Sequence, residues 1–192
     1  MSISSNLNAL KSELPPHVTL VAVSKTKPNE AVLEAYKTGH RIFGENRVQE
    51  LAEKAEQLPK DIQWHMIGHI QTNKIKYFAP FVALVHGVDR QKVLKELNKE
   101  AAKNNRVIDC LLQVHIAQEE TKFGFDEDEI KTLFTSGALA NYKNVRVRGL
   151  MGMATFTENQ DQVRAEFKTL KQLFDQIQTT FSIHDLIPQQ FT

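Results

Sequence analysis

Two lysines, Lys25 and Lys27, stand directly after an apolar stretch near the start of the chain. A lysine beside apolar side chains is costly to keep charged, so its pKa tends to fall, and a second cation nearby acts in the same direction. A neutral lysine amine is a nucleophile that can form a Schiff base with a carbonyl compound. The alternative is that both lysines are ordinary exposed charges at a turn, which is where most lysines lie.

The stretch that precedes these lysines predicts how Lys25 is positioned. Residues 18–23, VTLVAV, are apolar except for one Thr, as in a strand that is buried on both faces. Pro28 follows the lysines, and a residue that lacks an N–H suits the first turn of a helix. The sequence therefore predicts a buried strand with Lys25 at its carboxyl end, the edge at which parallel α/β proteins place their chemistry.

Three other residues at the ends of apolar runs are candidates for the same site. Asn46 closes the segment FGEN and offers both a donor and an acceptor, although it could equally cap a helix. His65 lies in WHMIG, and Met151 lies in GLMGM, where soft and small side chains suit a flat apolar ligand or the core. Lys122 in TKFGF could meet an anion, or belong to an ordinary loop.

A metal centre is not expected. His65 and His69 are four residues apart, which on a helix would suit a metal ion, but position 66 is Met rather than Glu and Gly68 separates the pair. Tetrahedral zinc needs three or four protein ligands. Cys110 is the only cysteine, so no pair of cysteines is present to join the histidines. Neither a Walker phosphate loop nor a GxGxxG segment occurs.

Apolar runs of strand length alternate with stretches of helical periodicity, which indicates a parallel sheet covered by helices. An open doubly wound sheet usually has a glycine-rich turn after its first strand, and none is present. Polar residues after many different strands are typical of a (β/α) barrel. We therefore expect an α/β fold with a barrel of about six βα units, too few to close eight strands. The expected strands are Val18–Val23, Arg41–Phe43, Ile62–His65, Phe81–Val85, Val107–Ile116 and Val145–Met151.

Composition limits the classes of partner. The 192 residues carry 24 basic and 23 acidic side chains, a net charge of +1, which gives no reason to expect nucleic acid or an anionic membrane as partner. No apolar run approaches the ~18 residues needed to span a bilayer, and the first residues lack the pattern of a secretory signal. Cys110 lies in an apolar run and is expected to be a buried free thiol, which fits a cytoplasmic setting.

Five segments in a fixed order together resemble a known family. VTLVAVSKTKP, FGENRVQE, WHMIGHIQTNK, TKFGF and VRGLMGM closely resemble the pyridoxal phosphate homeostasis proteins, whose fold is similar to the barrel domain of alanine racemase standing alone. The resemblance runs from about residue 7 to about residue 181. It implies a TIM-like (β/α) barrel of the alanine racemase N-terminal type.

The resemblance also implies a cofactor and a role. It implies pyridoxal 5′-phosphate (PLP), held as a Schiff base on Lys25, with Asn46, His65 and, more weakly, Met151 at family pocket positions. The implied role is intracellular PLP homeostasis without established catalytic turnover, with apo-enzymes that take up the cofactor as further partners. It implies neither nucleic acid nor membrane binding.

The end of the chain departs from the family. Family members continue with a serine-rich strand of the form SMGMS and then a segment like VRxGxxIFG, which supply the phosphate cup and the last two strands. This chain reads SIHDLIPQQFT instead. We expect residues 1–181 to form a partial PLP-binding barrel domain and residues 182–192 to form a divergent or truncated tail. Poor cofactor binding and a tendency to associate would follow from such an end.

Two enzymatic alternatives stay open. In a lyase or aldolase, Lys25 would form a Schiff base with a keto substrate and no cofactor would be needed. A PLP-dependent racemase would need a second acid or base across the ring. In alanine racemase that group is a tyrosine from another domain and a partner chain, so the sequence predicts negligible racemisation.

Overall fold

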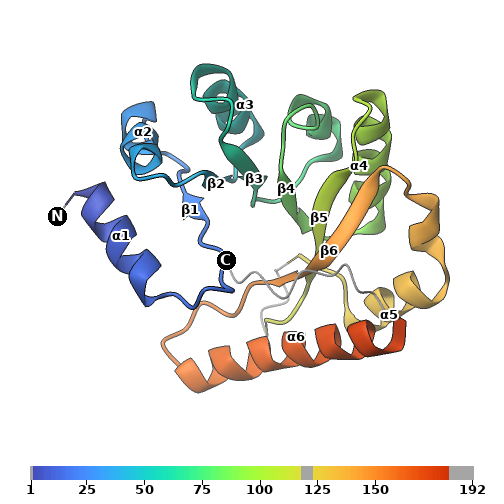
Figure 1. The fold of residues 1–192 in the computed structure, drawn as a ribbon. Coiled ribbons are helices and arrows are strands. Elements are labelled where there is room, and N and C mark those ends of the chain that lie inside the picture. Colours follow the sequence, from blue (N-terminus) through green and yellow to red (C-terminus); the bar gives the residue numbers. More distant parts are fainter. Residues whose placement is uncertain (1, 118–122, 182–192) are drawn as a thin grey trace.

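The computed structural model describes residues 2–117 and 123–181, which form one parallel sheet covered by helices (Figure 1). The strands are paired in sequence order, β1-β2-β3-β4-β5-β6, and each pairing is parallel. A parallel step needs a crossover connection, which the intervening helices and loops provide. The strands are β1 (Ala22–Val23), β2 (Ile42–Glu45), β3 (Gln63–Met66), β4 (Leu84–Val88), β5 (Ile108–Val114) and β6 (Val145–Gly152).

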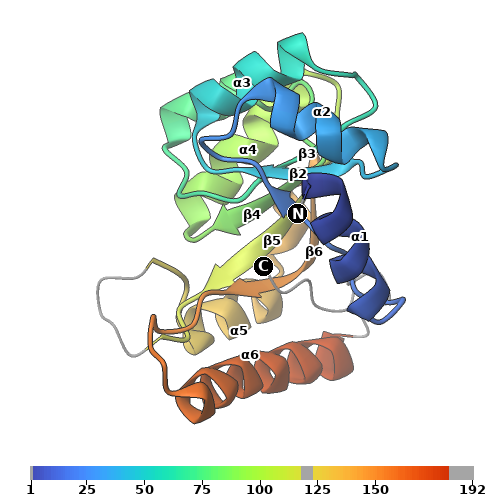
Figure 2. The same ribbon diagram turned by 90° about the vertical axis from the view of Figure 1, so that its left-hand side faces the viewer.

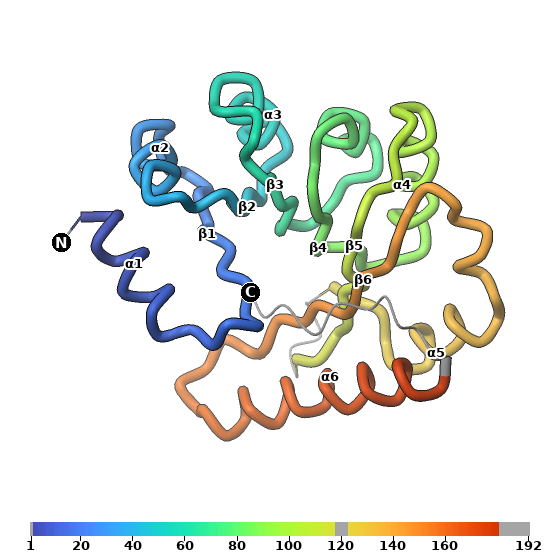
Figure 3. Tube along the Cα trace, viewed as in Figure 1, coloured from blue at the N-terminus to red at the C-terminus, as the bar shows by residue number. Residues whose placement is uncertain are grey.

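The helices lie along the outer side of a curved sheet. In Figure 1, α2, α3 and α4 follow one another along the curve, and Figure 2 shows α5 and α6 together on another side of the molecule. The tube in Figure 3 follows the same path, with α1 beside α2. The helices are α1 (Ile3–Glu13), α2 (Asn29–Lys37), α3 (Val48–Gln57), η1 (Thr72–Tyr77), α4 (Gln91–Lys103), α5 (Glu127–Thr135), η2 (Ala138–Asn141) and α6 (Gln160–Phe181).

The two faces of the sheet bury different sets of side chains. Cross-strand partners share a face, so Phe43 and Trp64 both point outward to the helices, where they join the main apolar core. The inner, concave face carries His65 and its partner Leu84. Leu84 belongs to a second, small buried cluster with Leu111 and Met151. The concave face is therefore the side on which both polar and apolar candidate residues gather.

The first strand differs from the expectation. Val18–Val23 was expected to be buried on both faces, but only Ala22–Val23 forms a strand, and Val23 is 49% exposed. Within the described residues β1 pairs with β2 alone, so neither its free edge nor its concave face is covered by a neighbouring strand. An apolar run identifies a strand well, but its burial depends on what pairs beside it.

The expected fold class and the order of the other strands are confirmed. The other five strands lie within a few residues of their expected positions, and the predicted α/β fold with six parallel strands is found. Among residues 2–117 and 123–181, β1 and β6 are each paired on one side only, so the described sheet is an open barrel. Residues 182–192, the expected tail, lie outside the described part.

No helix within the described part of the chain is both long enough and apolar enough to cross a membrane. The longest is α6, whose 22 residues include six charged side chains from Asp161 to Asp175, of which Glu166 is buried. Its buried apolar residues belong to the main apolar core.

Candidate functional site

Lys25 lies in a tight turn at the carboxyl end of β1. The turn is closed by a hydrogen bond of 3.0 Å from Lys27 N–H to Ser24 O, and Ser24 N–H continues the sheet by donating to Gly44 O. Thr26 has a φ of 62°, a conformation that residues other than Gly adopt rarely. Lys25 itself is exposed, which agrees with the second of the two interpretations of this lysine, an exposed charge at a turn.

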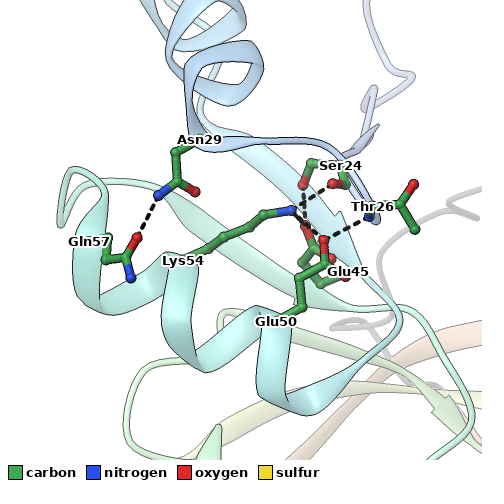
Figure 4. A network of polar contacts seen from close by, with 7 residues as sticks. All are labelled: Ser24, Thr26, Asn29, Glu45, Glu50, Lys54 and Gln57. Atoms are coloured by element: carbon green, nitrogen blue, oxygen red, sulfur yellow. Dashed lines mark hydrogen bonds and ion pairs between the residues drawn. The ribbon is translucent and has the colours of Figure 1, made fainter.

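A buried polar network lies behind this turn, between the sheet and α3 (Figure 4). Lys54 on α3 donates from Nζ to Ser24 O, to Glu45 Oε1 and to Glu50 Oε1, each at 2.7 Å. Ser24 Oγ also donates to Glu45 Oε1, at 2.7 Å. The three hydrogen bonds use every donor that an ammonium group has, which is how a charge is kept inside a protein.

The network also reaches the residue after Lys25. Thr26 N–H donates to Glu50 Oε1 at 2.7 Å, so the same oxygen accepts from Lys54 and from the turn. Partial burial raises the pKa of Glu50, but the hydrogen bonds from Lys54 and from the Thr26 N–H outweigh it and hold the pKa below its usual value. Glu50 is therefore an acceptor with its charge fixed at the turn.

Asn46 lies one strand along, at the end of β2. α3 begins at Val48 with Arg47 at the N-cap position, so Asn46 does not cap the helix. Its Oδ1 is buried without a hydrogen-bond partner among the described residues. Asn46, His69 and Lys74 contribute to the lining of a pocket of about 200 Å³ at this edge of the sheet. An unpaired buried acceptor beside a pocket is suited to a ligand that brings a donor.

Gly68 allows the ends of β2 and β3 to approach each other. A Cβ at this position would lie 2.3 Å from Asn46 O and 2.7 Å from Asn46 Cα. Backbone atoms cannot move aside as the end of a side chain can, so a residue with a side chain would push the Asn46 segment away. The glycine in WHMIG is therefore part of what places Asn46.

His65 lies on the concave face, where it contacts a second buried histidine. His86 Nε2 is 3.0 Å from His65 Nδ1. His65 is 4% exposed and His86 is 0% exposed. Burial lowers the pKa of His65 to about 4, and burial together with the neighbouring ring lowers the pKa of His86 to about 3. Both imidazoles are therefore neutral at physiological pH.

His69, the second histidine of the HxxxH spacing, has different neighbours. Its Nδ1 lies 3.0 Å from Asp89 Oδ2, and its ring stacks on Phe123 with centroids 4.1 Å apart. The Phe123 segment is fastened to β5, because Gln113 Nε2 donates to Phe123 O and Phe125 N–H donates to Gln113 O. The two histidines therefore serve separate contacts, and Lys122 lies outside the described residues.

Met151 lies on the concave face of β6, in register with Gln113 and 3% exposed. Lys25, Asn46 and His65 belong to the ends of three neighbouring strands, so the sheet brings them together. Lys25 and Met151 instead belong to the two outer strands, with β2 to β5 between them in the sheet. The structure thus groups three of the four candidates and places the fourth on the far side of the same concave face.

Sequence reasoning missed the residues that support the turn. Glu50 and Lys54 have the i,i+4 spacing of a helical ion pair, which was a usable signal. Nothing in the sequence indicated that the pair would be turned inward against Ser24. His86 follows an apolar run, but only the register of β4 shows that it faces His65.

Comparisons with known proteins identify the family. The family described as "Alanine racemase, N-terminal domain" matches residues 1–185. A protein of Aquifex aeolicus named "Pyridoxal phosphate homeostasis protein" is 41% identical over 165 residues, which are 85% of this chain and 72% of that protein. A protein of the same name from Haemophilus influenzae is 33% identical over 190 residues, 92% of this chain and 79% of the relative.

A solved structure supports the same assignment. PipY of Synechococcus elongatus PCC7942, solved without PLP and with PLP bound, is 31% identical to this chain. The match covers 99% of this chain and 87% of the PipY chain. The TM-scores are 0.90 without PLP and 0.87 with it. The chain therefore belongs to the family of pyridoxal phosphate homeostasis proteins, which carry the alanine racemase N-terminal domain.

Proposed function

We propose that this chain binds PLP as a Schiff base on Lys25 and takes part in cytoplasmic PLP homeostasis. The names of the relatives from Aquifex aeolicus and Haemophilus influenzae support the role, and the PLP-bound structure of PipY supports the ligand. The geometric observation that carries the proposal is an exposed lysine at the end of β1, beside β2, which Asn46 directly follows. When bound, the cofactor supplies an aldehyde that condenses with a lysine amine.

The residues at the edge of the sheet fit such a ligand. Lys25 is exposed, so its amine is open to an aldehyde from solvent. Asn46 Oδ1 is a buried acceptor without a partner among the described residues, so it would gain a hydrogen bond from a polar ligand. His65 would offer a neutral imidazole, and Met151 an apolar wall, from the concave face.

We further propose a carrier rather than a catalyst. The relatives are named for homeostasis, not for a reaction. A carrier needs a reversible bond to its cofactor and a path by which the cofactor can leave. A Schiff base on Lys25 would be reversible, and the exposed position of this lysine leaves it open to solvent. Apo-enzymes that require PLP would then be the acceptors of the cofactor.

Chemical trapping tests the proposal directly. The chain is incubated with PLP, reduced with borohydride and digested, and the modified peptide is identified by mass spectrometry. We expect modification at Lys25 and its loss in Lys25→Ala, whereas the matched variant Lys27→Ala, altered two residues away in the same exposed segment, stays labelled. Labelling that is unchanged in Lys25→Ala would contradict the assignment.

The same preparation separates the proposal from its rivals. A cofactor carrier absorbs visible light when loaded with PLP, whereas a lyase or aldolase that uses Lys25 with a keto substrate needs no cofactor. An assay of L-alanine conversion to D-alanine addresses the racemase alternative. Turnover at enzyme-like rates, either of a keto substrate without cofactor or of L-alanine to D-alanine, would overturn the proposal of a carrier.

A further inference from the structure

We propose that Lys54, together with Glu45 and Glu50, positions Lys25 for attack on an aldehyde by holding the turn on both sides of it. This inference rests on the proposed function, because it assigns a role to Lys25. The three residues do not touch the ligand in this proposal. They lie on the outer side of the sheet and act through the backbone of the turn.

The contacts of Lys54 point to the turn. Its Nζ is buried, and one of its three donors is spent on a backbone carbonyl of the segment that carries Lys25, Ser24 O. Ser24 is anchored twice more, through its N–H to Gly44 O and through its hydroxyl to Glu45. The residue before Lys25 is therefore held by β2 and by α3 at once.

The residue after Lys25 is held by the same network. Thr26 N–H donates to Glu50 Oε1, and Glu50 is fixed by Lys54 four residues along α3. A further hydrogen bond, from Asn29 Nδ2 to Gln57 Oε1, joins the start of α2 to the end of α3 (Figure 4). Lys25 thus lies between two residues whose polar groups are tied to one helix, while its own side chain is exposed.

The backbone of the turn gives a reason for this arrangement. Thr26 has a φ of 62°, and a residue with a branched Cβ is strained in that conformation. Strained backbone persists where the surroundings hold it, and it is found preferentially at functional sites. Without the acceptor on Glu50, the turn is expected to relax to a more open conformation and to release Lys25 from its fixed direction.

Stability alone does not account for a buried charge at this place. Desolvation of two ions offsets much of their attraction, and well-packed apolar residues in place of a buried pair are often as stable. A second carboxylate, Glu45, is 0% exposed and has one oxygen without a partner among the described residues. Such a costly group is explained if the hydrogen bonds that it shares with Lys54 and Ser24 fix a geometry.

Backbone amide exchange and the rate of labelling test the proposal in the full chain. The variants are Glu50→Ala, which removes the acceptor for Thr26, and Glu50→Gln, which keeps a carbonyl oxygen at the same position. Glu127→Ala is the matched control, because Glu127 forms an i,i+4 pair with Lys131 on the surface of α5. Near-ultraviolet circular dichroism of the buried Trp64 verifies that each variant is folded.

We expect Glu50→Ala to speed hydrogen exchange at the Thr26 amide by about tenfold to a hundredfold, because a charge-assisted hydrogen bond is lost. Reductive labelling of Lys25 by PLP should slow by about tenfold, because the backbone that carries this lysine is no longer held in one conformation. Glu50→Gln should restore most of both properties. The control Glu127→Ala should change neither.

The proposal fails if folded Glu50→Ala exchanges and labels as the parent does, or if Glu50→Gln is as impaired as Glu50→Ala. Failure of the proposed function is a separate result, since the parent chain would then show no adduct at Lys25. In that case, if hydrogen exchange at the Thr26 amide is unchanged in Glu50→Ala, the positioning role is overturned as well. If exchange is faster in Glu50→Ala and returns to the parent rate in Glu50→Gln, the result supports the role of Glu50 in holding the turn.

Discussion

His86 Nε2 lies 3.0 Å from His65 Nδ1, and neither ring has appreciable contact with solvent. At this distance one nitrogen must donate its proton and the other must accept it, so the tautomers of the two neutral rings are coupled. A second proton on both rings would bring two N–H groups face to face. The pair therefore opposes protonation of both rings at once, in addition to the effect of burial on each ring.

This pair predicts that the chain loses stability in mild acid. The folded pKa values, about 4 for His65 and about 3 for His86, lie below the ordinary value of 6.5. The contribution to stability is therefore complete above pH ~6.5, where both the folded and the unfolded chain hold neutral imidazoles. Between pH ~6.5 and the folded values only the unfolded chain binds the protons, so the free energy of unfolding falls as the pH falls. Urea unfolding at several pH values measures this slope.

An exposed histidine provides the control for the acid dependence. Substitution His17→Gln, which removes a histidine that lies at the surface, is the matched variant for comparison with the buried pair. His86→Gln, which removes one ring of the pair, should flatten the slope even if it lowers stability at neutral pH. A slope that is the same in the parent and in folded His86→Gln would show that the pair does not govern the response.

Cys110 is expected to react slowly with thiol reagents in the folded chain. It is 0% exposed on β5, and burial raises the pKa of its thiol well above the ordinary value, so little thiolate is present. Modification should be slow in buffer and complete in denaturant. A variant Ser12→Cys, which adds a cysteine at an exposed position of α1, should react rapidly at one site. Rapid modification of Cys110 in the folded parent would contradict its burial.

The order and type of the elements could be predicted from the sequence, because the spacing of apolar residues distinguishes strands from helices. The runs at residues 41–43, 62–65 and 145–151 became strands, and Asp126 with Glu129 forms a capping box at the start of α5. Burial of the first strand could not be predicted in the same way. The apolar residues of 18–23 show strand propensity, but coverage of their concave face depends on strands that pair elsewhere in the fold.

The candidate site was predictable only in part, for a physical reason. A residue at the end of a parallel strand is expected near the other strand ends, and Lys25, Asn46 and His65 follow that rule. The side chains that hold the turn at Lys25 come from the opposite face of the sheet and from the buried side of α3. A lysine on a helix is usually a surface charge, and only the packing of α3 against β2 turns Lys54 inward.

Two glycines predict contrasting effects of an added methyl group. In Gly68→Ala the new Cβ would meet Asn46 O at 2.3 Å, whereas in Gly44→Ala it would meet the Ile67 Cδ1 atom at 3.0 Å. A flexible side chain can move aside and a neighbouring backbone cannot. We expect Gly68→Ala to lose about 1–3 kcal/mol of stability and Gly44→Ala to lose less. Chemical denaturation of both variants measures the difference, and equal losses would contradict the close approach at Gly68.

Removal of the buried ammonium group should be far more costly than removal of a surface one. Lys54→Met leaves Glu45 and the largely buried Glu50 without their cation, and breaking a buried pair in this way typically costs about 3–5 kcal/mol. Lys131→Met, which breaks an exposed i,i+4 pair of similar distance with Glu127, should cost far less, because solvent screens the attraction between exposed charges. Urea unfolding at neutral pH provides both values.

A double variant separates the charge from the packing at this position. In Glu45→Gln with Lys54→Met, the fully buried carboxylate is replaced along with its cation, so much of the penalty of an uncompensated charge is removed. We therefore expect the double variant to be more stable than Lys54→Met alone by at least about 1 kcal/mol, a non-additive result that distant sites do not give. Additive losses in the double variant would mean that Glu45 and Lys54 stabilise the fold independently, against the direct bond at 2.7 Å.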